Sequence, residues 1–114
     1  MSLLDNILMQ EITTKNDFLE LVAIQIHKDF SRAGIDLNKD SKFLIAQEVR
    51  EKISLCLNHL NEVNPTLITH LLYIIDVSEN KLKDLPNEIQ KRNERLTTLI
   101  LLRCAEKVWY RNNN

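Results

Sequence analysis

Glycine is almost absent from this chain of 114 residues, which contains only Gly34. Phosphate-binding loops, dinucleotide-binding fingerprints and nucleophile elbows each need several glycines, because their backbones turn sharply or approach a ligand closely. The sequence therefore excludes these enzyme classes. Proline is limited to Pro65 and Pro86. A fold of many strands needs more frequent tight turns than so few turn-forming residues supply.

Net charge, cysteine and long apolar runs are scarce as well. The formal net charge of -1 gives no overall field that attracts nucleic acid or an anionic membrane. No uncharged apolar run approaches the ~20 residues of a membrane span, and the first residues lack the pattern of a secretion signal. The two cysteines, Cys56 and Cys104, lie within helical patterns and are expected to pack as small hydrophobic side chains. We therefore expect a cytoplasmic protein with no membrane partner.

What the sequence does contain is helical periodicity. Its length fits one domain that buries roughly two-thirds of its unfolded surface, so we expect a single helical domain over residues 1–114. Apolar residues recur at steps of three and four in four longer segments, 17–33, 41–63, 65–77 and 87–111, and in a shorter one, 2–12. The sequence predicts an all-α fold, an up-and-down helical bundle of four main helices plus a short N-terminal helix. Residues 1–15 are expected to be the most loosely attached, and 112–114 to fray.

The stretch 64–77 looks like the centre of this bundle. Asn64 followed by Pro65 is typical of a helix start, and no charged residue follows until Asp76. The helix should be wet on one narrow side only, which predicts that the other helices pack around it. Residues 96–102, in the last helix, are apolar nearly all round and should also be buried on several sides.

Two helix patterns predict which residues face inward. In the first long helix the apolar face leaves Glu20, Lys28, Asp29 and Arg32 on other sides, and Gly34 followed by Ile35 predicts a left-handed C-terminal cap. The second long helix has the heptad spacing of shallow helix crossings. Its expected seam consists of Ala46, Val49, Ile53, Cys56, Leu60 and Val63.

Metal binding and cysteine catalysis are not expected. Asp36, Asn38 and Asp40 have the opening spacing of a calcium-binding EF-hand loop, but the required glycine and bidentate glutamate are missing. Cys56 and His59 are the one close pair of transition-metal ligands, whereas compact zinc motifs contain two such pairs. Neither cysteine is followed by a glycine-rich turn that would donate to an oxyanion. We expect no metal and no cofactor.

A polar strip on the helix at 65–77 is the candidate ligand-binding site. It consists of Thr66, Thr69, His70, Tyr73 and Asp76. If it meets solvent, it is the exposed edge of the helix. If it is buried, Asp76 needs a cation such as Arg103, and the strip belongs to a small-molecule-binding or catalytic bundle. Exposure is favoured, because the five groups are contiguous.

The last helix contains a basic face that is the candidate nucleic-acid surface. It consists of Arg92, Arg95, Arg103, Lys107 and Arg111, with Trp109 and Tyr110 nearby. Such a face can follow a phosphate backbone. Glu88 and Glu106 lie on the same side, however, and no helix-turn-helix is recognisable, so nucleic-acid binding is the second alternative.

The chain has more apolar positions outside the main seams than one small bundle covers. These interface candidates are Leu21, Ile24, Phe43, Leu44, Leu55, Leu96, Leu99 and Ile100. Apolar surface of this kind marks protein interfaces, and most soluble oligomers are symmetric homo-oligomers. The sequence therefore predicts a non-enzymatic helical protein that acts through protein contacts, as a homodimer.

Overall fold

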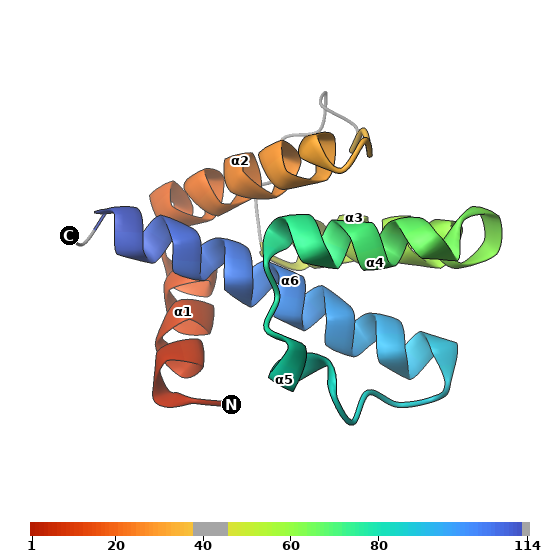
Figure 1. Cartoon of the computed structure of the whole chain (residues 1–114). Coiled ribbons are helices and arrows are strands. Elements are labelled where there is room, and N and C mark those ends of the chain that lie inside the picture. Colours follow the sequence, from red (N-terminus) through yellow and green to blue (C-terminus); the bar gives the residue numbers. More distant parts are fainter. Residues whose placement is uncertain (38–45, 113–114) are drawn as a thin grey trace.

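The computed structural model describes residues 1–37 and 46–112, and of Ala46 it describes the backbone alone. The described helices are α1 (Leu3–Thr14), α2 (Asn16–Arg32), α3 (Ala46–Val63), α4 (Pro65–Ile75), the one-turn α5 (Glu79–Leu82) and α6 (Ile89–Asn112) (Figure 1). The prediction of an all-α helical bundle is confirmed. The predicted start of the second long helix and the last two residues of the expected frayed tail lie outside the described residues. None of the helices in the described ranges has the length and apolar character needed to cross a membrane.

The central element is α6, not α4. It packs against α1, α2, α3 and α4 and runs through the middle of the bundle (Figure 1). Nine of its residues are buried, whereas α4 buries three. The expectation for 64–77 was wrong, because the polar side of α4 keeps that helix at the surface. The buried residues in the segment 96–102 of α6 are Leu96, Thr97, Ile100, Leu101 and Leu102.

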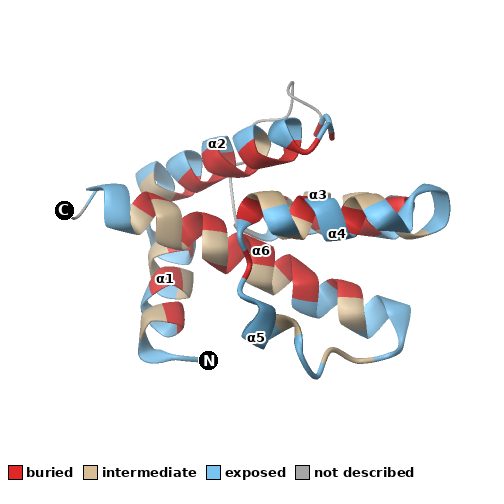
Figure 2. Ribbon diagram, viewed as in Figure 1, coloured by how far each residue is buried: buried red, intermediate tan, exposed pale blue. Residues whose placement is uncertain are grey.

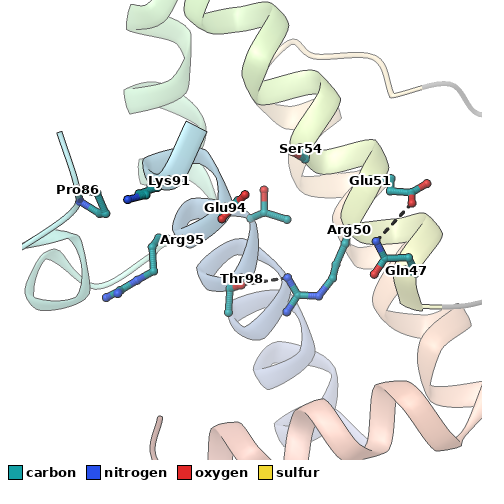
Figure 3. A pocket seen from close by; sticks show the side chains of 10 residues that line it. Gln47, Arg50, Glu51, Ser54, Pro86, Lys91, Glu94, Arg95 and Thr98 are labelled. Carbon is teal, nitrogen blue, oxygen red and sulfur yellow. Dashed lines mark hydrogen bonds between the residues drawn. The ribbon is translucent and has the colours of Figure 1, made fainter. Parts of the chain in front are cut away.

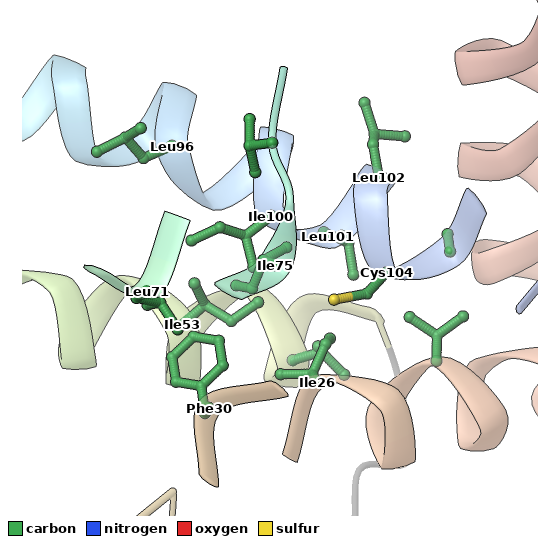
Figure 4. Packing of buried hydrophobic residues seen from close by; sticks show 14 of the residues in the cluster. Ile26, Phe30, Ile53, Leu71, Ile75, Leu96, Ile100, Leu101, Leu102 and Cys104 are labelled. Carbon is green, nitrogen blue, oxygen red and sulfur yellow. The ribbon is translucent and has the colours of Figure 1, made fainter. Parts of the chain in front are cut away.

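The hydrophobic core receives side chains from all five longer helices. Among its fully buried members are Leu8, Ile12, Ile26, Phe30, Ile53, Leu71, Ile75, Ile100 and Leu101. Figure 4 shows side chains of α2, α3, α4 and α6 meeting at this point, and Figure 2 shows buried residues gathered on the inward faces of the helices. Leu8 and Ile12 of α1 belong to this core, and the loose attachment of residues 1–15 stays a prediction.

The buried face of α3 differs from the predicted seam. Val49, Ile53 and Leu60 are buried as expected, but Leu57 replaces Cys56, which is only half-buried. Val63 is 60% exposed, because it lies at the free end of the hairpin between α3 and α4. A straight helix turns once every 3.6 residues, so its inward face drifts away from a strict heptad spacing.

Helices α2 and α4 end in the same backbone motif. After α2, Gly34 has a φ of 81°, and the amides of Ile35 and Gly34 donate to the carbonyls of Phe30 (2.9 Å) and Ser31 (2.9 Å). This is a Schellman motif, which confirms the predicted left-handed cap. After α4, Asp76 takes the glycine position with a φ of 68°, and its amide and that of Val77 donate to the last turn. The left-handed residue explains why α4 stops at Ile75, two residues before the predicted end.

Candidate functional site

The polar strip of α4 lies at the surface. Thr66, Thr69, His70, Tyr73 and Asp76 are all exposed, Tyr73 to 80%. The strip is therefore the solvent-exposed edge of α4. The small-molecule alternative required it to line an internal cavity, and it does not. Thr69, Tyr73 and Asp76 line a surface groove, whereas Thr66 and His70 lie outside it. Their role in ligand binding stays a prediction.

Asp76 and Arg103 join the end of α4 to α6. The Arg103 guanidinium donates from Nε to the Asp76 carbonyl (3.0 Å) and from Nη2 to the Asp76 carboxylate (3.2 Å). Its Nη1 donates to Glu106 (2.8 Å). The sequence proposed Arg103 as the partner of a buried Asp76, but the Asp76 side chain is 80% exposed. Arg103 therefore holds a left-handed turn in place at the surface.

A groove of about 890 Å³ lies between α4, the segment that contains α5, and the first half of α6. Its apolar side chains are Pro65, Ile68, Leu72, Val77, Leu82, Leu85 and Leu96. Polar and charged side chains also line it, namely Asn61, Thr69, Tyr73, Asp76, Ser78, Glu79, Asp84 and Arg92. Apolar surface with polar groups around it is the arrangement of a protein-docking site. The sequence pattern predicted part of the α4 side but not the groove.

A second groove, of about 830 Å³, lies between α3 and α6, and nearly all the residues that line it are polar or charged types. The Arg50 guanidinium donates to the Thr98 hydroxyl (3.1 Å), and the Gln47 amide donates to Glu51 (3.3 Å). Figure 3 shows Arg95 and Lys91 directed away from α3, whereas Arg50 reaches from α3 toward Thr98. The basic groups do not converge on one point, so the groove offers no single anion site.

The basic face of α6 is largely engaged within the chain. Lys107 donates to Asp29 (2.7 Å), Arg111 to Gln25 (3.1 Å) and Arg92 to the Pro86 carbonyl (3.2 Å). Arg103 is bonded to Asp76 and Glu106, as described above. Of the five candidates only Arg95 is exposed without such a bond among the described residues. Arg92 and Arg111 keep their charge, because their acceptors are uncharged, so nucleic-acid binding through this face stays a prediction.

A buried polar network between α2 and α6 was missed by the sequence analysis. Asp29, expected off the apolar face, is 0% exposed. Its carboxylate accepts hydrogen bonds from Lys107 (2.7 Å), Gln25 (3.1 Å) and the Cys104 thiol (3.6 Å). Gln25 and Asp29 each precede a core residue in the sequence, Ile26 and Phe30, and this position was the only sign in the sequence that they could be buried. A buried carboxylate with three donors is satisfied, so this network fixes how α2 packs on α6.

A second buried polar group, Asn93, joins α6 to α3. Its amide is 1% exposed, donates to the Asn58 side chain (2.7 Å) and accepts from Asn61 (2.9 Å). The Thr97 hydroxyl donates to the Asn93 carbonyl (2.7 Å). No buried side-chain nitrogen or oxygen in the described part of the chain lacks a partner. The hydrogen bonds of Asn93 therefore join α6 to α3 and satisfy its side-chain amide without a ligand.

The eight interface candidates divide into three groups. Leu96 and Ile100 are buried in the core and Leu99 packs against it half-buried, so little of these three side chains is exposed. Phe43 and Leu44 lie outside the described residues. Leu21, Ile24 and Leu55 are exposed, to 39%, 64% and 69%. The surplus that suggested a dimer is therefore smaller than expected, because α6 is buried on several sides.

The exposed apolar residues of α2 lie within an ordered surface, which we call the α2 face. It consists of Asp17, Leu21, Ile24 and Lys28, all exposed and separated by steps of four, three and four. This is the heptad spacing, so the four side chains share one side of the helix. The α2 face has an acidic end, an apolar centre and a basic end.

The two cysteine thiols are expected to differ in reactivity. Burial raises the pKa of the Cys104 thiol, and the Asp29 carboxylate raises it further, whereas Cys56 is half-buried and burial alone raises its pKa. Because the thiolate is the reactive form, Cys104 should react with a disulfide reagent only when the protein unfolds. Mass spectrometry after labelling in native buffer should find Cys56 modified first. The variant Cys56→Ser should show no labelling until urea is added, and prompt labelling of it would contradict the packing around Cys104.

The chain matches no protein-family model, no curated protein and no solved structure.

Proposed function

We propose that this protein is non-enzymatic and acts through protein contacts, and that it self-associates as a homodimer through the α2 face. The observation that supports this is the order of exposed side chains on α2, from Asp17 through Leu21 and Ile24 to Lys28. We also propose a cytoplasmic location, which the two unpaired cysteines support.

The α2 face is complementary to itself. When two copies are related by a twofold axis perpendicular to α2, the two α2 helices run antiparallel, and each contact occurs twice. If the axis passes between Leu21 and Ile24, Leu21 of each copy meets Ile24 of the other. The same register places Asp17 of each copy opposite Lys28 of the other. Opposite charges then flank a small apolar centre at both ends.

The proposed dimer is weak, because one helix pair is a small interface. Stable complexes bury about 1,600 Å² in total, more than two short helix faces provide. Exposed ion pairs contribute only about 0.2–1 kcal/mol each, so Asp17 and Lys28 determine the orientation more than the affinity. We expect a dissociation constant in the micromolar range.

Charge exchange across the twofold axis tests this arrangement. Light scattering at tens of micromolar should give a dimer for the unmodified protein. The variants Asp17→Lys and Lys28→Asp should each be more monomeric, because each places like charges opposite one another. Mixing the two single variants should restore the dimer, since both charge pairs are then opposite again.

Two controls keep the test specific. Ile24→Lys should abolish the dimer, because it places a charge at the apolar centre. Leu55→Lys changes an exposed apolar residue of α3 and should leave the dimer intact. A monomer at every concentration would end the proposal of self-association, and failure of the mixed variants to associate would rule out the antiparallel register.

A further inference from the structure

We propose that the groove between α4, α5 and α6 binds a basic amphipathic helix of a partner protein. This groove is separate from the α2 face, so the inference does not depend on the homodimer. It assigns a second contact surface and the chemistry of what that surface recognises.

The apolar side chains of the groove are packed on the core, and some of them are still partly exposed. Ile68, Val77 and Leu96 belong to the core and are at most 8% exposed. Leu72, Leu82 and Leu85 are half-buried, so their side chains pack on the core and still present apolar surface to the groove. The volume of about 890 Å³ lies within the range of binding pockets, about 300–1,000 Å³. Several apolar side chains of a partner fit into such a space.

The walls of the groove favour a helical partner. An extended peptide binds by adding a strand to a sheet edge, and the described residues contain no strand. Proline-rich peptides need a groove lined by aromatic rings, and Tyr73 is the one aromatic residue that lines this groove. A helix that inserts apolar residues at i, i+3 or i+4, and i+7 matches the remaining mode. The exposed Tyr73 ring, beside the apolar floor, is suited to pack against it.

The charges that line the groove determine the sign of the charge expected on the partner helix. Asp76, Glu79 and Asp84 line it together with a single cation, Arg92. Asp76 is already paired with Arg103. Glu79 and Asp84 have no ion-pair or hydrogen-bond partner in the described part of the chain. These two carboxylates complement lysine or arginine beside the apolar stripe of the partner helix.

A peptide-display library tests the groove directly. A library of random peptides about sixteen residues long, enough for roughly four helical turns, is selected on the full chain. Selected peptides should combine helical apolar spacing with a net positive charge. In fluorescence anisotropy, Thr69→Arg should weaken their binding by at least about tenfold, because it places a long charged side chain in the groove. Thr66→Arg, one turn away and outside the groove, is the matched control and should bind normally.

The acidic groups are tested by neutral variants. Glu79→Gln and Asp84→Asn should each weaken binding about two- to fivefold at low salt, and high salt should weaken binding to the unmodified chain. Asparagine tolerates the positive φ of Asp84, so this change leaves the turn intact. Glu62→Gln, on the exposed side of α3, should have no effect. Selected peptides that are neutral or acidic, or that bind Thr69→Arg unchanged, would overturn the inference. Ile24→Lys should not alter peptide binding, so a failed dimer and a failed groove are told apart.

Discussion

Asp29→Leu is expected to destabilise the protein by about 2–4 kcal/mol, because it leaves Lys107 next to the core without its anion. Loss of one partner from a fully buried pair costs about 3–5 kcal/mol. The expected value is lower here because the Lys107 side chain is 19% exposed and recovers part of its hydration. Arg32, whose side chain is 57% exposed, returns to water and adds little. Urea unfolding followed by circular dichroism measures the free energy of unfolding directly.

A double-mutant cycle separates the ion pair from general packing. Lys107→Met alone should also destabilise, because the fully buried Asp29 then keeps only one cation, the exposed Arg32 at 3.6 Å. The double variant Asp29→Leu/Lys107→Met should lose less than the sum of the two single changes, since neither charge is then left unpaired. Strict additivity would show that the two side chains do not interact.

The helices and their ends were predictable because their signals are local. The periodicity of 17–33, the pair Asn64 and Pro65, and Gly34 followed by Ile35 each act within a few residues of the chain. Predicted boundaries differ from the observed ones by two residues or fewer wherever the structure describes both, because fraying and caps change only the last turn.

The burial of Asp29 was not predictable from periodicity. Its main partner, Lys107, is 78 positions further along the chain. A charged residue on a helix is assigned to the wet side unless a partner is known, and no local pattern identifies that partner. The same reason explains the central place of α6, since contacts with four other helices are not visible in one helical segment.

Part of the α2 face was predictable from the sequence, but the groove was not. Leu21 and Ile24 were predicted as interface residues, but their relation to Asp17 and Lys28 required knowing which side of α2 is buried. The groove depends on how the segment after α4 returns to the start of α6, and that path follows from the left-handed turn at Asp76. Asp76 gave no signal for such a turn, because glycine usually occupies this position.

Leu71→Ala, on α4, is expected to destabilise the protein by about 2–5 kcal/mol. Leu71 is 0% exposed and belongs to the core, so the shorter side chain removes buried apolar contact and leaves a cavity. Tyr73→Ala is the matched change two residues away. Its ring is 80% exposed, so the free energy of unfolding should change by about 0.5 kcal/mol or less. Thermal and urea unfolding of the two variants measure this difference, and equal destabilisation would mean that α4 is turned differently on the bundle.

The same pair of variants separates folding from binding in α4. Tyr73 lines the groove and is absent from the core. Tyr73→Ala should therefore weaken binding of the selected peptides to the groove while the fold remains intact. An exposed aromatic ring contributes little to the stability of the free protein but buries a large area when a partner covers it. Leu71 should contribute to the stability of the free protein and little to binding, because its contacts are already made in the free chain. The helix that looked like the centre of the fold is therefore its boundary, with one side that supports the core and another that is exposed.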